Sequence, residues 1–340
     1  MKNGYKTAWM YFGIHLLVER VCFHILYSYF RNIPMASLMA LSFDFFAFVP
    51  QGLFGVLMDR YKKLNLGLVG AGFMFCSTLI FLLGLESLHT FGLILVAIGN
   101  AIIHAAGAIA TTSVSHGKLA HVAIFVGGGS FGVITGQTLG TYQTPIVIAS
   151  LLCIAIGVLI QMSNKYWLTD KRTIPEFTLS KKSVNSWVII LVAFMVVIVR
   201  SYIGYAIPIS WKKELWQSFL LFFIMGLGKM MGGILSDKFG AKKIGVASTL
   251  LCIPFLLFGN NNMVISVLGV FMFSLTMSIS FGTLLSEIQG EPGLAFGVTT
   301  IGLFIGVIPI FFFTIPSYIN TILIIILSIA CAIGMYCTMD

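Results

Sequence analysis

Long apolar runs alternate with short polar connections along the whole chain. A helix that crosses the hydrocarbon core of a bilayer needs about 20 mostly apolar residues, and twelve runs fit that criterion. In the first half we expect helices at 7–30, 34–58, 64–84, 90–115, 119–140 and 145–163. In the second half we expect them at 185–208, 214–236, 242–259, 262–287, 293–314 and 317–338. The pattern predicts an all-α membrane protein with twelve transmembrane helices.

One long polar interruption divides six helices from six. It predicts three parts: an N-terminal six-helix bundle at 1–163, a basic linker at 164–184 and a C-terminal six-helix bundle at 185–340. The charged and turn residues of the linker are Lys165, Asp170, Lys171, Arg172, Pro175, Glu176, Lys181 and Lys182. Because the other connections are short, neighbouring helices are expected to run antiparallel.

Composition agrees with a lipid environment. Hydrophobic residues make up 58% of the 340 residues and charged residues 9%, against roughly a quarter charged in soluble domains. The net charge of +9 could suggest nucleic acid, but the basic residues lie in short loops with little aromatic interleaving, so we expect no nucleic-acid binding. The six cysteines lie within apolar runs and form no CxxC pair, which is typical of buried small residues.

The distribution of basic residues predicts the orientation. With the N-terminus inside, the inner segments hold Lys2, Lys6, Arg60, Lys62, Lys63, Lys118, Lys165, Lys171, Arg172, Lys181, Lys182, Lys238, Lys242 and Lys243. The outer segments hold only Arg31, Lys212 and Lys213. Cytoplasmic loops are enriched in Lys and Arg, so both termini are expected in the cytoplasm and the chain in the plasma membrane.

A short polar pattern occurs twice, about half a chain apart. The first copy runs from Gly55 through Asp59 and Arg60 to Lys63, and the second from Gly233 through Asp237 and Lys238 to Lys242 and Lys243. Each follows the second helix of its six-helix unit. A repeat on this scale indicates two bundles related by an axis along the membrane normal.

Both copies resemble the signature loop of major facilitator transporters, Gly-x-Leu-x-Asp-Arg-x-Gly-Arg-Lys/Arg. The first copy departs from it at Lys62 and Lys63, and the second at Lys238 and Ala241. The resemblance implies two pseudo-symmetric six-helix bundles and a gating latch at Gly55, Asp59, Arg60, Lys63, Gly233, Asp237, Lys238 and Lys242. In such a latch the aspartate faces a neighbouring helix N-terminus and a basic side chain in one transport state and releases them in another. The alternative is a plain positive-inside loop.

Glycines recur in the fifth predicted helix at Gly132, Gly136 and Gly140. Their spacing resembles the fifth-helix motif of facilitator antiporters, although Gln137 replaces the usual proline. Close packing of small residues is an equal alternative. Pro208 and Pro309, with the glycines near them, are expected hinges, with plain packing as the alternative.

A narrower resemblance joins several short motifs. His15-x-x-x-Glu19, Gly99-Asn100-Ala101 with His104, the helix 119–140 glycines, and Arg200-Ser201 with Pro208 are similar to the fosmidomycin-resistance group of facilitator exporters. This resemblance implies export of a small solute.

Ionisable residues at mid-membrane are costly, so each is a functional candidate. The expected helix depths place Glu19, Asp44 and His104 near the centre and Arg200 nearby. We expect a substrate and proton site formed by Glu19, Asp44, Arg200, His15, His104, Tyr202 and Tyr205. Interhelix pairing is the structural alternative for each, and it is favoured for His24 and Lys229, which can be structural or snorkelling.

The sequence favours a secondary transporter of a small organic solute, proton-coupled and working by alternating access, with export by antiport ahead of uptake or facilitated diffusion. The resemblance implies a monomer without cofactor. No familiar spacing of metal ligands, nucleophile triad or phosphate loop is present, so an enzyme or non-transporting receptor is a remote alternative.

Overall fold

The computed structural model describes residues 2–169 and 172–340. Asp170 and Lys171 of the predicted linker lie outside the described residues. The first half contains α1 (Lys2–Ile25), the π-helix η1 (Leu26–Phe30), α2 (Ala36–Phe48), α3 (Gln51–Arg60), α4 (Gly67–Leu82), the 3-10 helix η2 (Glu86–Leu88), α5 (His89–Ser113), α6 (Leu119–Thr141) and α7 (Val147–Trp167). The second half contains α8 (Ser186–Ala206), α9 (Leu215–Phe239), α10 (Ala241–Phe258), α11 (Met263–Ser274), α12 (Thr276–Glu287), α13 (Pro292–Phe312) and α14 (Ser317–Thr338).

The predicted helices are present, and two of them are interrupted. The run 34–58 forms α2 and α3, with a break before Gln51 at Pro50, which has no N–H to continue the helical hydrogen bonds. The run 262–287 forms α11 and α12, which meet at Leu275. In the described part of the chain, eleven helices or pairs of helices are long and apolar enough to cross a membrane, and α4, with 16 residues, is the shorter apolar helix.

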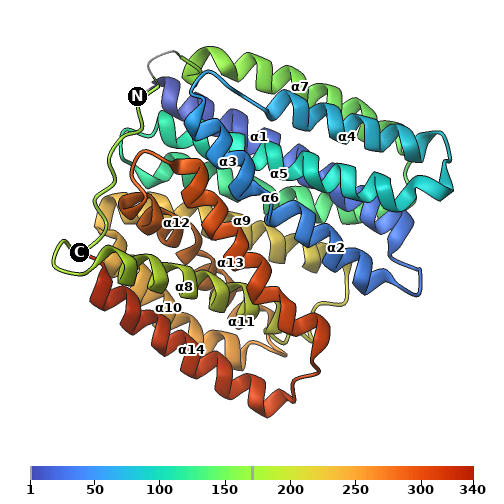
Figure 1. Cartoon of the computed structure of the whole chain (residues 1–340). Helices are drawn as coiled ribbons and strands as arrows, with labels where there is room; N and C mark the ends of the chain where they lie inside the picture. Colours follow the sequence, from blue (N-terminus) through green and yellow to red (C-terminus); the bar gives the residue numbers. More distant parts are fainter. Residues whose placement is uncertain (1, 170–171) are drawn as a thin grey trace.

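The same packing pairs occur in both halves. In the first, α1 packs on α6 and α7, and α4 packs on α5 and α7. In the second, α8 packs on α13 and α14, and α10 packs on α11 and α14. In Figure 1 the two sets lie side by side, with α1–α7 above and α8–α14 below. Contacts of α6 with α9 and of α3 with α13 join the halves. The architecture is two pseudo-symmetric six-helix bundles; the boundaries at 163–164 and 184–185 stay a prediction.

Both chain ends lie at one end of the molecule (Figure 1), which we call the terminal side. The described part of the linker crosses this side. The Arg172 guanidinium donates to the carbonyl of Met58 at 2.6 Å, and the Lys181 N–H donates to the carbonyl of Thr338 at 2.9 Å. Burial lowers the pKa of Arg172, and the nearby carboxylate of Asp59 acts against that shift. The linker is therefore bonded to α3 of one half and to the end of α14 of the other.

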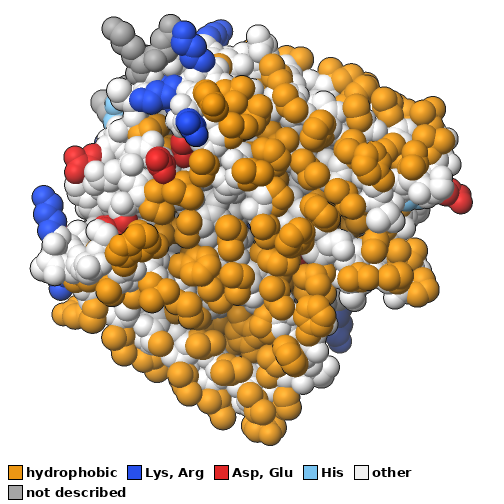
Figure 2. Space-filling model, viewed as in Figure 1, with side chains coloured by type: hydrophobic (Ala, Val, Ile, Leu, Met, Phe, Trp, Pro, Cys, Tyr) orange, Lys and Arg blue, Asp and Glu red, His pale blue; other side chains and the backbone are white. Residues whose placement is uncertain are grey.

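The surface suits lipid. In Figure 2, hydrophobic side chains cover the middle of the face shown, and most of its charged side chains gather at the margin near the termini. Large apolar side chains such as Leu53, Phe91, Leu151 and Trp187 are more than half exposed. By contrast, α5 and α6 are mostly buried inside the bundle, with 83% of the residues in their apolar windows buried. Polar side chains on these inner helices and on the helices that touch them can therefore meet at the centre of the molecule.

Candidate functional site

At the end of α3, Asp59 binds the first residues of a helix in the other half. Its two carboxylate oxygens accept hydrogen bonds from the backbone N–H groups of Gly293, at 3.1 Å, and Leu294, at 2.9 Å. These residues open α13, and the first N–H groups of a helix have no partner within the helix. A carboxylate satisfies two of them and also interacts favourably with the positive end of the helix dipole.

At the end of α9, Asp237 does the same in the opposite direction. Its two oxygens accept from the N–H groups of Leu119 and Ala120, both at 2.9 Å. These residues open α6 in the first half. Each half therefore extends one aspartate to cap one helix of the other half, and both contacts lie on the terminal side.

The glycines of the repeat lie where the two halves approach each other closely. A Cβ atom on Gly293 would lie 2.5 Å from the carbonyl oxygen of Gly55, and a Cβ on Gly55 would overlap the backbone of Gly293. A Cβ on Gly233 would lie 2.8 Å from the carbonyl oxygen of Leu119 and would meet the side chain of Ala123. Larger residues at these glycines would push α3 from α13 and α9 from α6.

The basic residues of the repeat lie beside aromatic rings. The Arg60 guanidinium is 6.0 Å from the ring centre of Tyr61, and the Lys238 ammonium is 5.1 Å from that of Phe239. The Lys242 ammonium is 4.6 Å from the ring centre of Tyr336, and Lys63 is exposed in the turn after α3. The hydrogen-bond partners that the structure gives to both aspartates are backbone amides, and Arg172 and Lys118 interact electrostatically with Asp59 and Asp237. The basic partners expected within the repeat and the switching role stay predictions.

At the centre of the first half, Glu19, His15 and His104 converge from α1 and α5. The Nε2 atom of His104 lies 3.3 Å from Oε1 of Glu19, and Nε2 of His15 lies 4.0 Å from the same oxygen. The two imidazole rings are 4.3 Å apart and almost perpendicular. The three side chains are 8–13% exposed, so the group is largely shielded from the outside.

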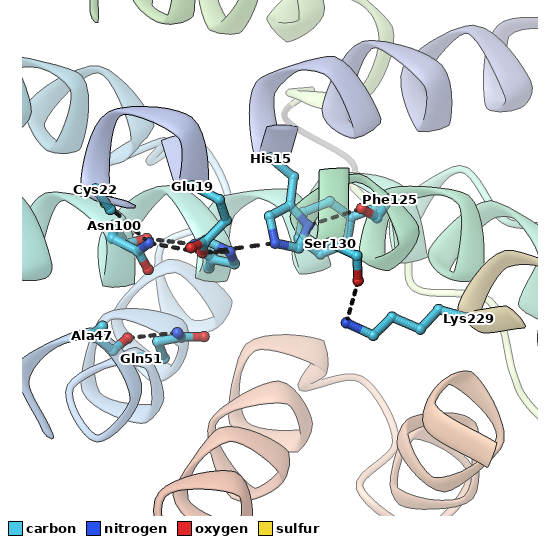
Figure 3. Close-up of polar contacts among 10 residues, drawn as sticks. His15, Glu19, Cys22, Ala47, Gln51, Asn100, Phe125, Ser130 and Lys229 are labelled. Carbon is cyan, nitrogen blue, oxygen red and sulfur yellow. Dashed lines mark hydrogen bonds and ion pairs between the residues drawn. The ribbon is translucent and has the colours of Figure 1, made fainter. Parts of the chain in front are cut away.

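Neighbouring polar groups that the sequence analysis did not select complete this centre. Asn100, one helical turn before His104, donates from Nδ2 to Oε1 of Glu19 at 2.9 Å. Gln51, at the start of α3, is 1% exposed, and its Oε1 has no hydrogen-bond partner among the described residues. In Figure 3, Gln51 lies across from Glu19, and Lys229 extends from α9 toward Ser130, whose hydroxyl it binds at 3.0 Å. The lysine expected to be structural or snorkelling thus points inward.

Two further predicted site residues lie near Glu19. Asp44 on α2 is half-buried and interacts electrostatically with Glu19. Tyr205, near the end of α8, interacts electrostatically with both carboxylates, and its side chain is exposed. Tyr205 is therefore the predicted residue of the second half that lies within the electrostatic reach of the Glu19 group.

The structure does not bring Arg200 and Tyr202 into this group. Arg200 is 8% exposed inside the second half, where its Nε donates to the hydroxyl of Thr276 at 3.0 Å and its guanidinium lies over the ring of Phe273. The cavity beside it has a volume of about 20 Å³, which is room for about one water molecule. The Tyr202 hydroxyl donates to Asn320 at 2.8 Å. Both side chains point into their own bundle. The sequence did not predict this, because hydropathy does not tell which face of α8 turns to the partner bundle.

The residues predicted for packing and hinges are three glycines of α6 and two prolines, Pro208 and Pro309. Gly132, Gly136 and Gly140 lie against α1; a Cβ on Gly136, for example, would be 2.5 Å from the carbonyl oxygen of Arg20. Pro309 lies inside α13. Pro208 follows the end of α8 at Ala206, so the expectation that it lies within that helix is wrong: its ring restricts the preceding residue to extended conformations and the helix ends before it.

Comparisons with known proteins give a likeness of fold. No protein-family model and no curated protein sequence matches the chain. Among solved structures, the chain is similar to a crystal structure of FucP, a major facilitator superfamily transporter, in the outward conformation. The match has a TM-score of 0.63 and 15% sequence identity, and it covers 97% of this chain and 98% of FucP. The chain therefore has the major facilitator fold.

Proposed function

We propose that this protein is a secondary active transporter that moves a small organic solute by alternating access. The observation that carries the proposal is the pair of contacts between the halves on the terminal side, Asp59 with the start of α13 and Asp237 with the start of α6. Rigid-body rocking of one bundle against the other is how transporters built from such repeats expose a central site to each side in turn. Separating the bundles at this end would break both contacts together.

The contacts suit a reversible gate. Each consists of two hydrogen bonds to a charged group, worth roughly 1.5–3 kcal/mol apiece, at the polar rim of the bundle. Water replaces these bonds when the halves part, and the quoted values already include that exchange, so opening costs only a few kcal/mol per contact. With the termini in the cytoplasm, as the positive-inside distribution predicts, the present arrangement is closed toward the cytoplasm. FucP, the protein of similar fold, was crystallised in the outward conformation.

Coupling to protons is the finer part of the proposal. Glu19 and Asp44 are the carboxylates near the centre, and two imidazoles lie beside Glu19. Carboxylates in a poorly solvated site exchange protons with little movement of the side chain, and the protonation state biases which side is open. Export by antiport is favoured over uptake because of the motif similarity to the fosmidomycin-resistance exporters and because the spacing of Gly132, Gly136 and Gly140 resembles the antiporter motif.

Flux measurements in reconstituted vesicles test the proposal. Vesicles carrying an imposed pH gradient and a metabolite mixture should accumulate or lose a solute only when the protein is present. Glu19→Gln should lower this gradient-driven flux by at least about tenfold, because a neutral amide carries no exchangeable carboxyl proton. The matched control is Glu86→Gln, an exposed carboxylate outside the bundle centre, which should leave flux unchanged. Full flux in both Glu19→Gln and Asp44→Asn would refute proton coupling at these sites, and no solute flux in wild-type vesicles would refute transport.

A further inference from the structure

Three potential metal ligands meet at one point inside the first half. One ring nitrogen each of His15 and His104 and a carboxylate oxygen of Glu19 all lie within 4.8 Å of one another, and Nε2 is the ring nitrogen that lies 4.0 Å (His15) and 3.3 Å (His104) from Oε1 of Glu19. His15 and Glu19 share a face of α1, four residues apart, and His104 approaches from α5. The three atoms belong to side chains that are largely buried, so bulk water has little access to the space between them.

The other nitrogen of each ring fixes its orientation. Nδ1 of His15 lies 2.9 Å from the carbonyl oxygen of Phe125, and Nδ1 of His104 lies 2.9 Å from that of Asn100. A carbonyl only accepts hydrogen bonds, so in both rings Nδ1 carries a hydrogen. In the neutral imidazole the lone pair is then on Nε2, the atom that faces Glu19. Histidines that bind metals are held in this way, with the second ring nitrogen donating to a carbonyl or carboxylate.

The carboxylate is held as well. Asn100 donates to Oε1 of Glu19 at 2.9 Å, and the same residue supplies the carbonyl that orients His104. One residue of α5 therefore positions two of the three ligands. Two imidazole lone pairs and a carboxylate that face one another repel unless a proton or a metal ion lies between them. Their arrangement calls for an electrophile at its centre.

The distances suit a tetrahedral transition metal. Zinc binds imidazole nitrogen and carboxylate oxygen at about 2.0–2.2 Å, which places neighbouring tetrahedral ligands roughly 3.3 Å apart. The Nε2 atom of His104 already lies 3.3 Å from Oε1 of Glu19, whereas Nε2 of His15, at 4.0 Å, has to come closer to Oε1 when an ion binds. Two imidazoles and one carboxylate favour zinc and its neighbours over magnesium or calcium, which prefer oxygen ligands.

Two charged groups near the cluster act in opposite directions. Lys229 interacts electrostatically with both His15 and Glu19 and weakens the binding of any cation there. Asp44 interacts electrostatically with Glu19 and offsets part of that effect. A divalent ion gains twice as much from the two carboxylates as a monovalent one, and it also forms coordinate bonds with the imidazoles.

We infer that His15, Glu19 and His104 bind one divalent transition-metal ion of the zinc class. The three side chains fill three positions of a tetrahedron and leave the fourth open to water or to a group of a solute. The inference goes beyond the proposed function, because it concerns binding at equilibrium and holds whether or not the ion is carried across the membrane.

Cobalt binding to the purified full chain tests the site. Any affinity tag is removed, bound metal is stripped with a chelator, and the protein in lipid nanodiscs is titrated with Co²⁺ and then with Zn²⁺. We expect one Co²⁺ per chain with the visible absorption of a tetrahedral site, and displacement of that absorption by Zn²⁺. Glu19→Gln and His104→Gln should each weaken binding by at least about tenfold, whereas Lys229→Gln should tighten it.

Matched variants separate ligand loss from misfolding. His24→Gln alters another buried histidine of α1, which binds the carbonyl of Thr144, and should leave Co²⁺ binding unchanged. His104→Cys keeps a metal ligand at the same place and should retain binding with a changed, thiolate-type spectrum. No saturable Co²⁺ uptake by the wild-type chain, or equal loss in His24→Gln and His104→Gln, would overturn the inference. Because the binding experiment uses no gradient or solute, that result would leave the transport proposal standing. Conversely, an absence of flux with intact Co²⁺ binding would refute transport and leave the metal site standing.

Discussion

The two halves are alike at the terminal side and different at their centres. Asp59 and Asp237 hold the first N–H groups of α13 and α6 in the same way, with two hydrogen bonds each of 2.9–3.1 Å. At the centre, the first half holds Glu19 with His15 and His104. The second half holds Arg200 among Thr276, Met277 and Phe273.

The difference indicates that closing the terminal side requires both halves of the duplicated bundle, whereas binding at the centre does not. Closing the terminal side needs both copies, because each half caps a helix of the other and one contact alone would leave the second interface free to part. Binding at the centre has no such requirement, since one half can supply all the ligands. We therefore expect substitutions at the two ends to act equally, and substitutions at the two centres to act differently.

The largest effect is expected from removing both capping carboxylates. Asp59→Asn with Asp237→Asn removes the charge at both helix N-termini and one good acceptor at each, a loss of roughly 1.5–3 kcal/mol per site. The ratio of molecules closed to molecules open on the terminal side should fall by at least about tenfold per site. Spin labels on Lys62 and Lys242, with the exposed Cys76 and Cys337 replaced by Ser, would report the opening as a longer distance in pulsed electron resonance.

The single variants sharpen the comparison of the two ends. Asp59→Asn and Asp237→Asn should shift the label distance distribution to a similar extent, because their bonds are alike in number and length. A large shift in one and none in the other would break the equivalence of the two ends. Unchanged distances in the double variant would contradict the gate itself.

A smaller effect is expected from the glycines beside the aspartates. Gly55→Ala and Gly233→Ala place a Cβ against the backbone of the opposite half, and overpacking of this kind costs about 1–3 kcal/mol. Both should lower the melting temperature of the purified protein and favour the open form. The control is Gly72→Ala on α4, where an added Cβ meets nothing within 4 Å, so the melting temperature should stay the same or rise slightly. Equal behaviour of all three variants would show that close approach at the ends does not matter.

The helices were predictable from the sequence because lipid imposes a length and a composition on each span. The run 119–140 is observed as Leu119–Thr141, and 317–338 as Ser317–Thr338. The break at Leu275 was not predicted, because an apolar run in the sequence looks the same whether the helix continues or bends. The repeat also predicted that an aspartate would meet a helix N-terminus, but not that the helix would belong to the other half.

The candidate site was less predictable. Charge at mid-membrane singled out Glu19 and His104, but nothing in the sequence says that two histidines and a glutamate of α1 and α5 bring their ligand atoms within 4.8 Å of one another. Asn100 entered the sequence analysis only as part of a short motif, because the search for candidates at mid-membrane selected ionisable residues and an amide is uncharged. Arg200 was expected at the same site, and its place among Thr276 and Phe273 depends on the rotation of α8, which hydropathy does not determine.

The smallest effect is expected at the centre of the second half. Thr276→Val keeps the shape of the side chain but removes the hydroxyl that accepts from Nε of Arg200. Because the guanidinium keeps its contacts with Sδ of Met277 and the ring of Phe273, the cost is about 1 kcal/mol. Thermal unfolding in detergent should show the lower stability, while Co²⁺ binding at the Glu19 group should be unchanged. The control is Thr321→Val, where the lost hydroxyl bonds only to Ser317 of its own helix and is exposed, so stability should hardly change. If Thr276→Val instead weakened Co²⁺ binding as strongly as His104→Gln, the two centres would act as one site, and the contrast between the halves would not hold.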